Sequence, residues 1–120
     1  MKKRKLNITL ITNETTDEYN LLGEYDEVNK IITYNESNEL LTEVKLNLKD
    51  KILTRENKDY YLEYKFIENE ETENEINLKE LNQSISLKIK TNTFNINNNE
   101  VEITYTILDS NEKVTYIVKF

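Results

Sequence analysis

Two residues of opposite charge, Glu36 and Arg55, offer the most specific chemistry in this sequence. Glu36 continues the alternation of Ile32 and Tyr34, so it faces inward if those residues do. Arg55 has the parity of Leu53, in a segment where either face is a candidate core face. An inward glutamate and arginine would meet across the interior of a β-fold, where an unpaired charge is costly.

Two interpretations of this pair stay open. The functional one is a polar anchor for the carboxylate or amine of a small ligand, with Tyr25, Tyr34 and Tyr105 as walls. The structural one is an ion pair at a barrel mouth, or a pair of solvent-facing strand ends. The anchor interpretation fails if Glu36 and Arg55 are both fully exposed and apart.

Other chemical groups are abundant but carry no recognisable pattern. Five glutamates between positions 68 and 75 supply oxygen ligands of the kind Ca²⁺ and Mg²⁺ prefer, but they lack the aspartate and glycine spacing of an EF-hand. We therefore predict a solvated loop and no metal site. Eight tyrosines and three phenylalanines resemble the stacking residues of single-strand-binding barrels, but most have the inward parity of a core.

The amino-acid composition excludes several classes of reaction. The chain has no cysteine and no histidine, which removes thiol nucleophiles, the commonest general base and the commonest metal ligand. A single glycine leaves no room for a glycine-rich phosphate loop. We therefore expect no enzyme, no catalytic residue and no cofactor. An enzyme using only Glu, Asp, Tyr, Lys or Arg is the third-ranked alternative.

The charge and hydropathy of the sequence limit the kinds of partner that the protein is expected to bind. The net charge is −7, and four of the sixteen cations lie at positions 2–5, so most of the surface repels a phosphate backbone. Polar residues interrupt the apolar ones after that basic start, unlike the apolar region of a signal peptide, and no stretch has the length of a membrane span. We expect a cytoplasmic protein that binds neither nucleic acid nor membrane.

The elements that position these residues are strands, because the apolar residues alternate with period two almost throughout. Turn signals rich in Asn and Asp separate the alternating segments. The predicted strands are 6–10, 19–26, 32–34, 42–49, 52–55, 60–66, 85–89, 94–96, 101–107 and 114–120.

Three segments are less regular. Residues 68–75 are predicted as a charged loop. Residues 74–82 fit either a short strand through Ile76 and Leu78 or a helical turn, and we favour the strand. The apolar parity flips between Thr91 and Thr93, which predicts a bulge or a strand break.

About ten short strands in 120 residues favour a closed sheet, because a flat one would leave long edges exposed. We predict one all-β domain over residues 1–120, a small antiparallel barrel of about 8–10 strands. A β-sandwich is the alternative.

A set of dispersed residues resembles a known family. Gly23-x-Tyr25, Ile32-x-Tyr34-x-Glu36, Thr42, Arg55, Phe66, Thr91 and Tyr105 occur in the order and spacing of the YwiB-like family of uncharacterised bacterial proteins. The similarity extends over nearly the whole chain, although Leu81-Asn82-Gln83-Ser84 replaces the family's Thr-Pro-Tyr-Gly-like turn. The resemblance implies a calycin-like, lipocalin-type barrel and assigns no activity.

These observations favour a barrel that binds a small molecule or a peptide in or at the mouth of its interior, although a barrel of this size is also able to fill itself with side chains. The second hypothesis is a protein-interaction module or homodimer that uses an outer face or a strand edge, with Ile11, Leu22, Tyr61 and Ile117 as contacts.

Overall fold

Alternating apolar and polar residues produce an all-β chain. A computed structural model describes residues 2–36 and 41–120, and every regular element in them is a strand. Among these residues, no helix is present that is long and apolar enough to cross a membrane. The strands are β1 Lys2–Ile11, β2 Thr16–Asp26, β3 Ile31–Asn35, β4 Glu43–Asn47, β5 Ile52–Glu56, β6 Tyr60–Lys65, β7 Glu71–Leu78, β8 Gln83–Asn97, β9 Glu100–Ile107 and β10 Glu112–Lys119.

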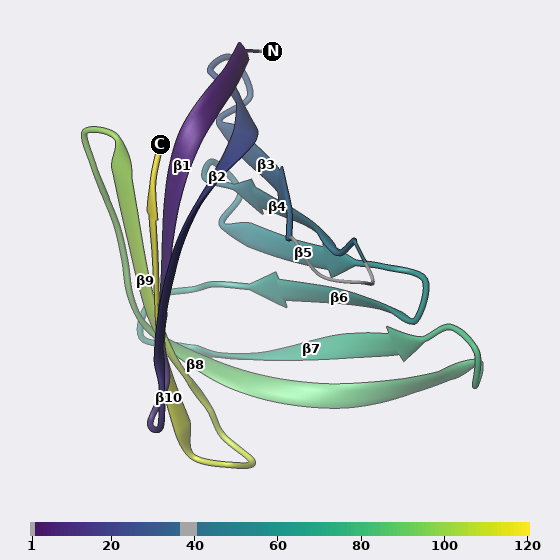
Figure 1. Cartoon of the computed structure of the whole chain (residues 1–120). Helices are drawn as coiled ribbons and strands as arrows, with labels where there is room; N and C mark the ends of the chain where they lie inside the picture. The colour runs from purple at the N-terminus through teal and green to yellow at the C-terminus, as the bar shows by residue number, and fades with distance from the viewer. Residues whose placement is uncertain (1, 37–40) are drawn as a thin grey trace.

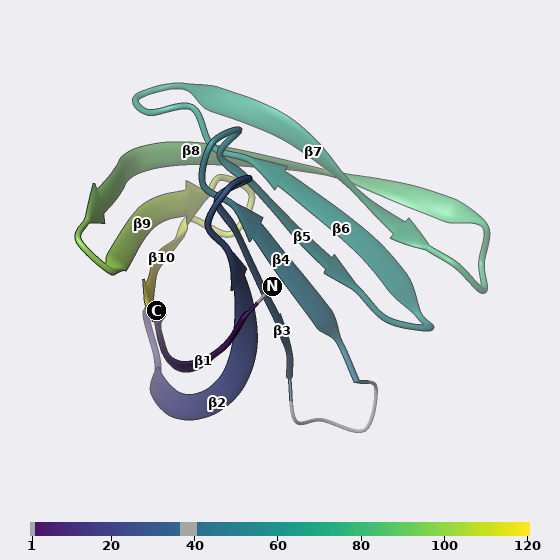
Figure 2. The same ribbon diagram turned by 90° about the horizontal axis from the view of Figure 1, so that it is seen from above.

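The ten strands form one closed, up-and-down antiparallel barrel. Each strand pairs with its neighbours in the chain, and β1 also pairs with β10, where Ile8 lies opposite Val118. β3 to β6 run side by side, whereas β1 and β2 curve strongly to meet β10 (Figures 1 and 2). The predicted antiparallel barrel is confirmed, and the sheet closes on itself instead of splitting into a sandwich.

Inward side chains of all ten strands form the core. In β4, Val44 and Leu46 are buried while Glu43 and Lys45 face solvent, as the alternation predicts. Close approach also constrains the wall at Gly23, where a Cβ atom would lie 2.7 Å from the backbone oxygen of Thr33. The single glycine of the chain is therefore needed for packing between β2 and β3.

Asparagine and aspartate side chains shape the turns of a chain that has almost no glycine. Asp26, Asn47 and Asn57 each begin a turn and accept hydrogen bonds from the backbone N–H groups two and three residues later. Asn98 and Asn111 take positive φ angles of 55° and 57°, which asparagine tolerates. The predicted Asn- and Asp-rich turns between strands are confirmed at these positions.

The three irregular segments differ in outcome. The register shift between Thr91 and Thr93 confirms the predicted bulge in β8. The predicted charged loop at residues 68–75 is wrong from Glu71 onward, because β7 begins there. β7 continues through Leu78, as the strand interpretation of that segment requires, and residues 79–82 form the turn into β8. The tip of this hairpin flares outward, so Ile85 is half exposed.

Candidate functional site

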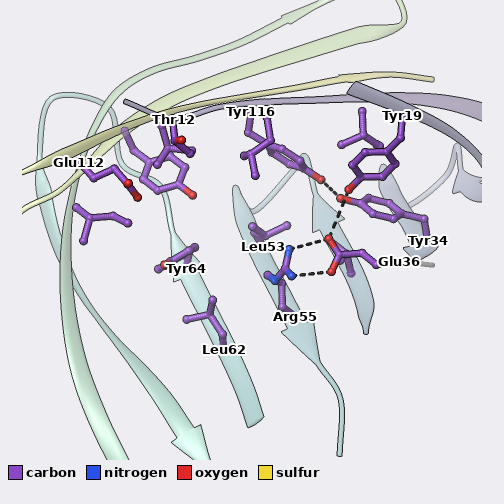
Figure 3. A pocket seen from close by; sticks show the side chains of 16 residues that line it. Thr12, Tyr19, Tyr34, Glu36, Leu53, Arg55, Leu62, Tyr64, Glu112 and Tyr116 are labelled. Carbon is purple, nitrogen blue, oxygen red and sulfur yellow. Dashed lines mark hydrogen bonds and ion pairs between the residues drawn. The ribbon is translucent and has the colours of Figure 1, made fainter. Parts of the chain in front are cut away.

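A cavity of about 270 Å³ opens at one end of the barrel. In an up-and-down barrel, alternate connections lie at the same end, and this end carries the β1–β2, β3–β4, β5–β6, β7–β8 and β9–β10 connections. Aliphatic side chains such as Leu10, Leu53 and Ile107 line the cavity. They share it with five tyrosines, Tyr19, Tyr34, Tyr64, Tyr105 and Tyr116, and with three charged residues, Glu36, Arg55 and Glu112 (Figure 3).

Glu36 and Arg55 form a bidentate ion pair inside this mouth. Nη2 of Arg55 lies 2.6 Å from Oε1 of Glu36, and Nη1 lies 3.1 Å from Oε2. Their side chains retain 18% (Glu36) and 28% (Arg55) of their accessible surface, so both are largely withdrawn from water. Parallel hydrogen bonds between two ionised groups are the strongest of the ordinary polar contacts. Each charge is therefore the principal partner of the other.

Local structure holds Glu36 in place at the end of β3. Its backbone N–H donates to the carbonyl of Thr42, which spans the β3–β4 connection. The Thr42 hydroxyl is buried and accepts a hydrogen bond from the Asn57 amide in the next turn at this end. The Tyr19 hydroxyl donates to the Glu36 carboxylate at 3.4 Å. Among the described residues, Glu36 thus has a fixed backbone and two side-chain donors, Arg55 and Tyr19.

Burial does not neutralise Arg55. Desolvation acts to lower the pKa of its guanidinium, but the contact with Tyr60 and the negative charge of Glu36 outweigh it, so the pKa of Arg55 is raised. The guanidinium therefore stays protonated at neutral pH. The formal charges of Glu36 and Arg55 cancel, and Glu112 is the third charged residue of the cavity lining.

A buried layer of tyrosines lies beside the pair. The hydroxyls of Tyr34 and Tyr116 hydrogen-bond to each other across the barrel. Burial first, and the neighbouring Tyr116 in addition, raise the pKa of Tyr34 well above its ordinary value. Burial also raises the pKa of Tyr116, although its hydrogen bond with Tyr34 acts to lower it. Desolvation and the Glu36 charge also raise the pKa of Tyr19. These phenols are neutral hydrogen-bonding groups at physiological pH.

The opposite side of the cavity is chemically different. Glu112 begins β10 and lies away from the Glu36–Arg55 pair, near Tyr64 (Figure 3). Within the described part of the chain, the side chains of Glu112, Tyr64 and Tyr105 have no hydrogen-bond or ion-pair partner. Desolvation first, and the charge of Glu112 in addition, raise the pKa of Tyr64 and of Tyr105. This side presents a carboxylate and two phenolic hydroxyls to the cavity.

The structure brings together four of the five residues predicted to form the site. Glu36, Arg55, Tyr34 and Tyr105 all line the cavity, and the pair is neither exposed nor apart. Tyr25 does not join them, because it lies opposite Ile32, four positions before Glu36 along β3. It packs against Phe120 with Arg4 over its ring, beside a second cavity at the other end of the barrel.

Of the tyrosines and glutamates that line the cavity, four were not among the predicted site residues: Tyr19, Tyr64, Tyr116 and Glu112. The three tyrosines have the inward parity of their strands, but parity alone does not distinguish a cavity wall from a filled core. Glu112 has the parity of Val114, Tyr116 and Val118, a signal that was present in the sequence but was masked by the adjacent turn. Its inward position follows from that parity.

The glutamates near β7 lie elsewhere. Glu71, Glu73 and Glu75 alternate on the outer face of the strand, and Glu73 accepts a hydrogen bond from Ser86. Among residues 2–36 and 41–120, no three acidic side chains converge in a way that would hold a metal ion.

Comparisons with known proteins extend the fold description. No protein-family model matches the chain, and no curated protein matches it at a significant level. Among solved structures it is similar to the crystal structure of the ywiB protein from Bacillus subtilis, with a TM-score of 0.69 and 14% sequence identity. The similarity covers 98% of this chain and 90% of that one. At this identity it shows a YwiB-like barrel fold.

Proposed function

We propose that this protein is a non-enzymatic barrel that binds a small molecule, or a side chain of a peptide, in the cavity beside Glu36 and Arg55. The observation that carries the proposal is the cavity itself. A barrel that served only as a scaffold would gain from filling this volume, because empty space forfeits packing energy. Here apolar walls surround a few convergent polar groups, which is the usual composition of a ligand site.

The volume suits a small ligand. About 270 Å³ holds on the order of nine water molecules at roughly 30 Å³ each. A dry cavity of about 150 Å³ is enough to bind benzene. One ring with a short side chain therefore matches the space, and a folded peptide does not fit inside it.

The type of barrel supports the same proposal. The resemblance to the YwiB-like family implies a calycin-like, bacterial protein, and calycin-type barrels such as lipocalins hold one small ligand in the interior. Fold analogy is a weak basis for function on its own, so the proposal rests on the lining residues.

The lining residues also support a binding role over catalysis. Glu36 is engaged by Arg55 and Tyr19, which leaves it poorly placed to act as a base. The buried phenols hold their protons at neutral pH. Neither the pair nor the phenols supply the activated nucleophile and base that group transfer needs.

A cavity-filling variant tests the proposal. Ile107 is half-buried at the mouth, and Ile107→Trp fills the space without touching the ion pair. Ile117→Trp adds the same bulk to the outer face of β10 and serves as the matched control. Ligand-observed NMR against a library of ring-sized fragments should give hits for the wild type and the control, and none for Ile107→Trp. Hits that survive Ile107→Trp would place binding elsewhere, and a wild type without hits would overturn the proposal.

The interaction module is the second hypothesis, and one observation favours it. Leu22 is 66% exposed on the outer face of β2. Because the sheet is closed, a partner would dock on such a face and not on a free strand edge. Native mass spectrometry of protein from the cells that naturally make it separates the two: a co-purifying small molecule supports the cavity, and a stable dimer supports the outer face. The cytoplasmic location stays a prediction.

A further inference from the structure

The polar groups of the cavity fall into a satisfied side and an unsatisfied side. On the first, Arg55 is neutralised by two hydrogen bonds from its guanidinium to Glu36. An anionic ligand would have to displace Glu36 to reach this arginine, and would leave a carboxylate without its partner in a part-buried site. The satisfied side is therefore a poor receptor for an anion.

The unsatisfied side has the opposite character. Glu112, Tyr64 and Tyr105 present oxygen atoms to the cavity, and among the described residues none of these oxygens has a hydrogen-bond or ion-pair partner. A carboxylate only accepts hydrogen bonds, and a phenol oxygen is able to accept one as well. A protonated amine offers three N–H donors, one for each of these three groups.

The electrostatics of the cavity favour the same charge. Its lining contains one arginine and two glutamates, so its formal charge is −1. Aromatic faces attract cations, and five tyrosines surround the space. Both effects are stronger in a site that excludes water.

The rim around the mouth adds an independent observation. Apart from Glu36, which belongs to the cavity, and from the β7–β8 tip, which flares away, the described residues of these connections carry three carboxylates against one lysine. The carboxylates are Glu14, Asp59 and Asp109, and the lysine is Lys58. The basic residues 2–5 lie at the opposite end, where Lys2 pairs with Tyr25. An acidic rim raises the local concentration of small cations at the entrance.

We infer that the ligand is a small organic monocation, a protonated amine on an apolar body about the size of one ring, anchored by Glu112 with Tyr64 and Tyr105. This inference rests on the proposed function, because it assigns the chemistry of the molecule held in the same cavity. In this arrangement the Glu36–Arg55 pair is a preformed wall, and Glu112 is the recognition group.

Three probes with the same phenyl ring and two-carbon chain test the inference by calorimetric titration of the full chain at low salt. 2-Phenylethylamine is a cation at neutral pH, 2-phenylethanol is neutral and 3-phenylpropanoate is an anion. We expect the amine to bind at least about tenfold more tightly than the alcohol, since a hydrogen bond to a charged group contributes that much or more. The anion should bind most weakly.

Two matched variants locate the anchor. Glu112→Gln removes the charge at nearly constant shape, and Glu102→Gln removes the same charge from the outer face of β9. We expect Glu112→Gln to reduce amine affinity to that of the alcohol and to leave alcohol affinity unchanged. Glu102→Gln should change neither. A thermal melt of each variant verifies that it folds.

The outcomes separate this inference from the proposed function. Equal binding of the three probes, tightest binding of the anion, or an amine preference that survives Glu112→Gln would overturn the cationic ligand while leaving the cavity as a binding site. Absence of binding by all three probes, together with an empty fragment screen, would overturn the proposed function itself.

Discussion

Replacing Arg55 with methionine tests whether the ion pair at the mouth holds the barrel together. Methionine keeps most of the length and apolar volume of the arginine stem, so the substitution removes the charge without opening a large cavity. Among the described residues, it leaves the Glu36 carboxylate with the Tyr19 hydroxyl as its remaining side-chain donor. The free energy of unfolding should fall because a part-buried charge has lost its counter-ion.

The magnitude follows from the burial of the two groups. Breaking a fully buried pair from one side costs about 3–5 kcal/mol, whereas an exposed pair contributes about 0–1 kcal/mol. Exposed fractions of 18% and 28% place this pair nearer the buried limit. We expect a loss of about 2–3 kcal/mol. At about 2.1 cal/mol/K per residue, the unfolding entropy of 120 residues converts each kcal/mol to about 4 °C, so Tm should fall by about 8–12 °C.

Thermal and urea unfolding of a double-mutant cycle measure this directly. The cycle compares wild type, Arg55→Met, Glu36→Leu and the double variant. Removing both partners eliminates the stranded charge, so the double variant should recover to within about 1 kcal/mol of wild type. The coupling energy between the two sites should reach about 1–3 kcal/mol. Lys79→Met is the exposed control, since its ion pair with Glu56 lies on the surface.

One result would refute the reasoning. If Arg55→Met costs no more than Lys79→Met, and the cycle shows no coupling, then water screens the mouth as it screens the outer surface. The pair would then be a surface contact, and the description of the mouth as a low-dielectric site would be wrong. Salt dependence gives a second reading, because a screened pair weakens as ionic strength rises.

Three further predictions concern the barrel wall and core. Thr91 is fully buried, and its hydroxyl has no hydrogen-bond partner among the described residues, so Thr91→Val should raise the unfolding free energy by about 1 kcal/mol; a loss in urea unfolding would contradict this. Gly23→Ala places a Cβ atom 2.4 Å from Leu6 and should cost about 1–3 kcal/mol by the same assay, unless the wall yields freely. Burial raises the pKa of Tyr34 and Tyr116 in the folded state, whereas unfolded tyrosine ionises near 10, so their contribution is complete below about pH 10 and is lost as the pH rises further. Tyr116→Phe should flatten this alkaline decline, and an unchanged slope would assign it to other groups.

Alternation predicted most of the architecture because most strands bury one face and expose the other. Val44, Leu46 and Thr42 are buried as expected, and Glu36 follows Tyr34 inward to meet Arg55. The direction of a side chain along a strand depends only on the parity of its position, so the sequence predicts it well. The meeting of Glu36 and Arg55 was therefore within reach of sequence reasoning.

The first part of β7 was not predicted, because its inward positions are polar. Its outward residues are Glu71, Glu73 and Glu75, while Thr72 and Asn74 occupy the inward parity where an apolar residue is expected. Asn74 is nevertheless buried, and its side-chain oxygen accepts the backbone N–H of Lys65 where the β6–β7 ladder is interrupted. An amide side chain thus replaces a backbone partner, and hydrophobic periodicity cannot detect that substitution.

The position of a residue along the barrel axis could not be predicted either. Parity gives the direction of a side chain, inward or outward, but not its distance from either end of the barrel. Tyr25 and Tyr105 share the inward orientation but lie near opposite ends. Depth depends on strand register, and register depends on turns whose lengths the sequence only suggests. Tyr25 was therefore assigned to the wrong end, although its burial was predicted correctly.

The division of the mouth into a satisfied and an unsatisfied side argues for a binding role more strongly than either side alone. Unpaired polar groups in a cavity cost stability, so a barrel selected only for stability would hold apolar side chains where Glu112 and Tyr105 lie. The same barrel satisfies Glu36, Arg55 and Tyr34 with short hydrogen bonds a few residues away. The chain pairs one set of polar groups completely and leaves the neighbouring set facing a cavity. This composition is the one expected of a preformed wall beside a surface that recognises a ligand.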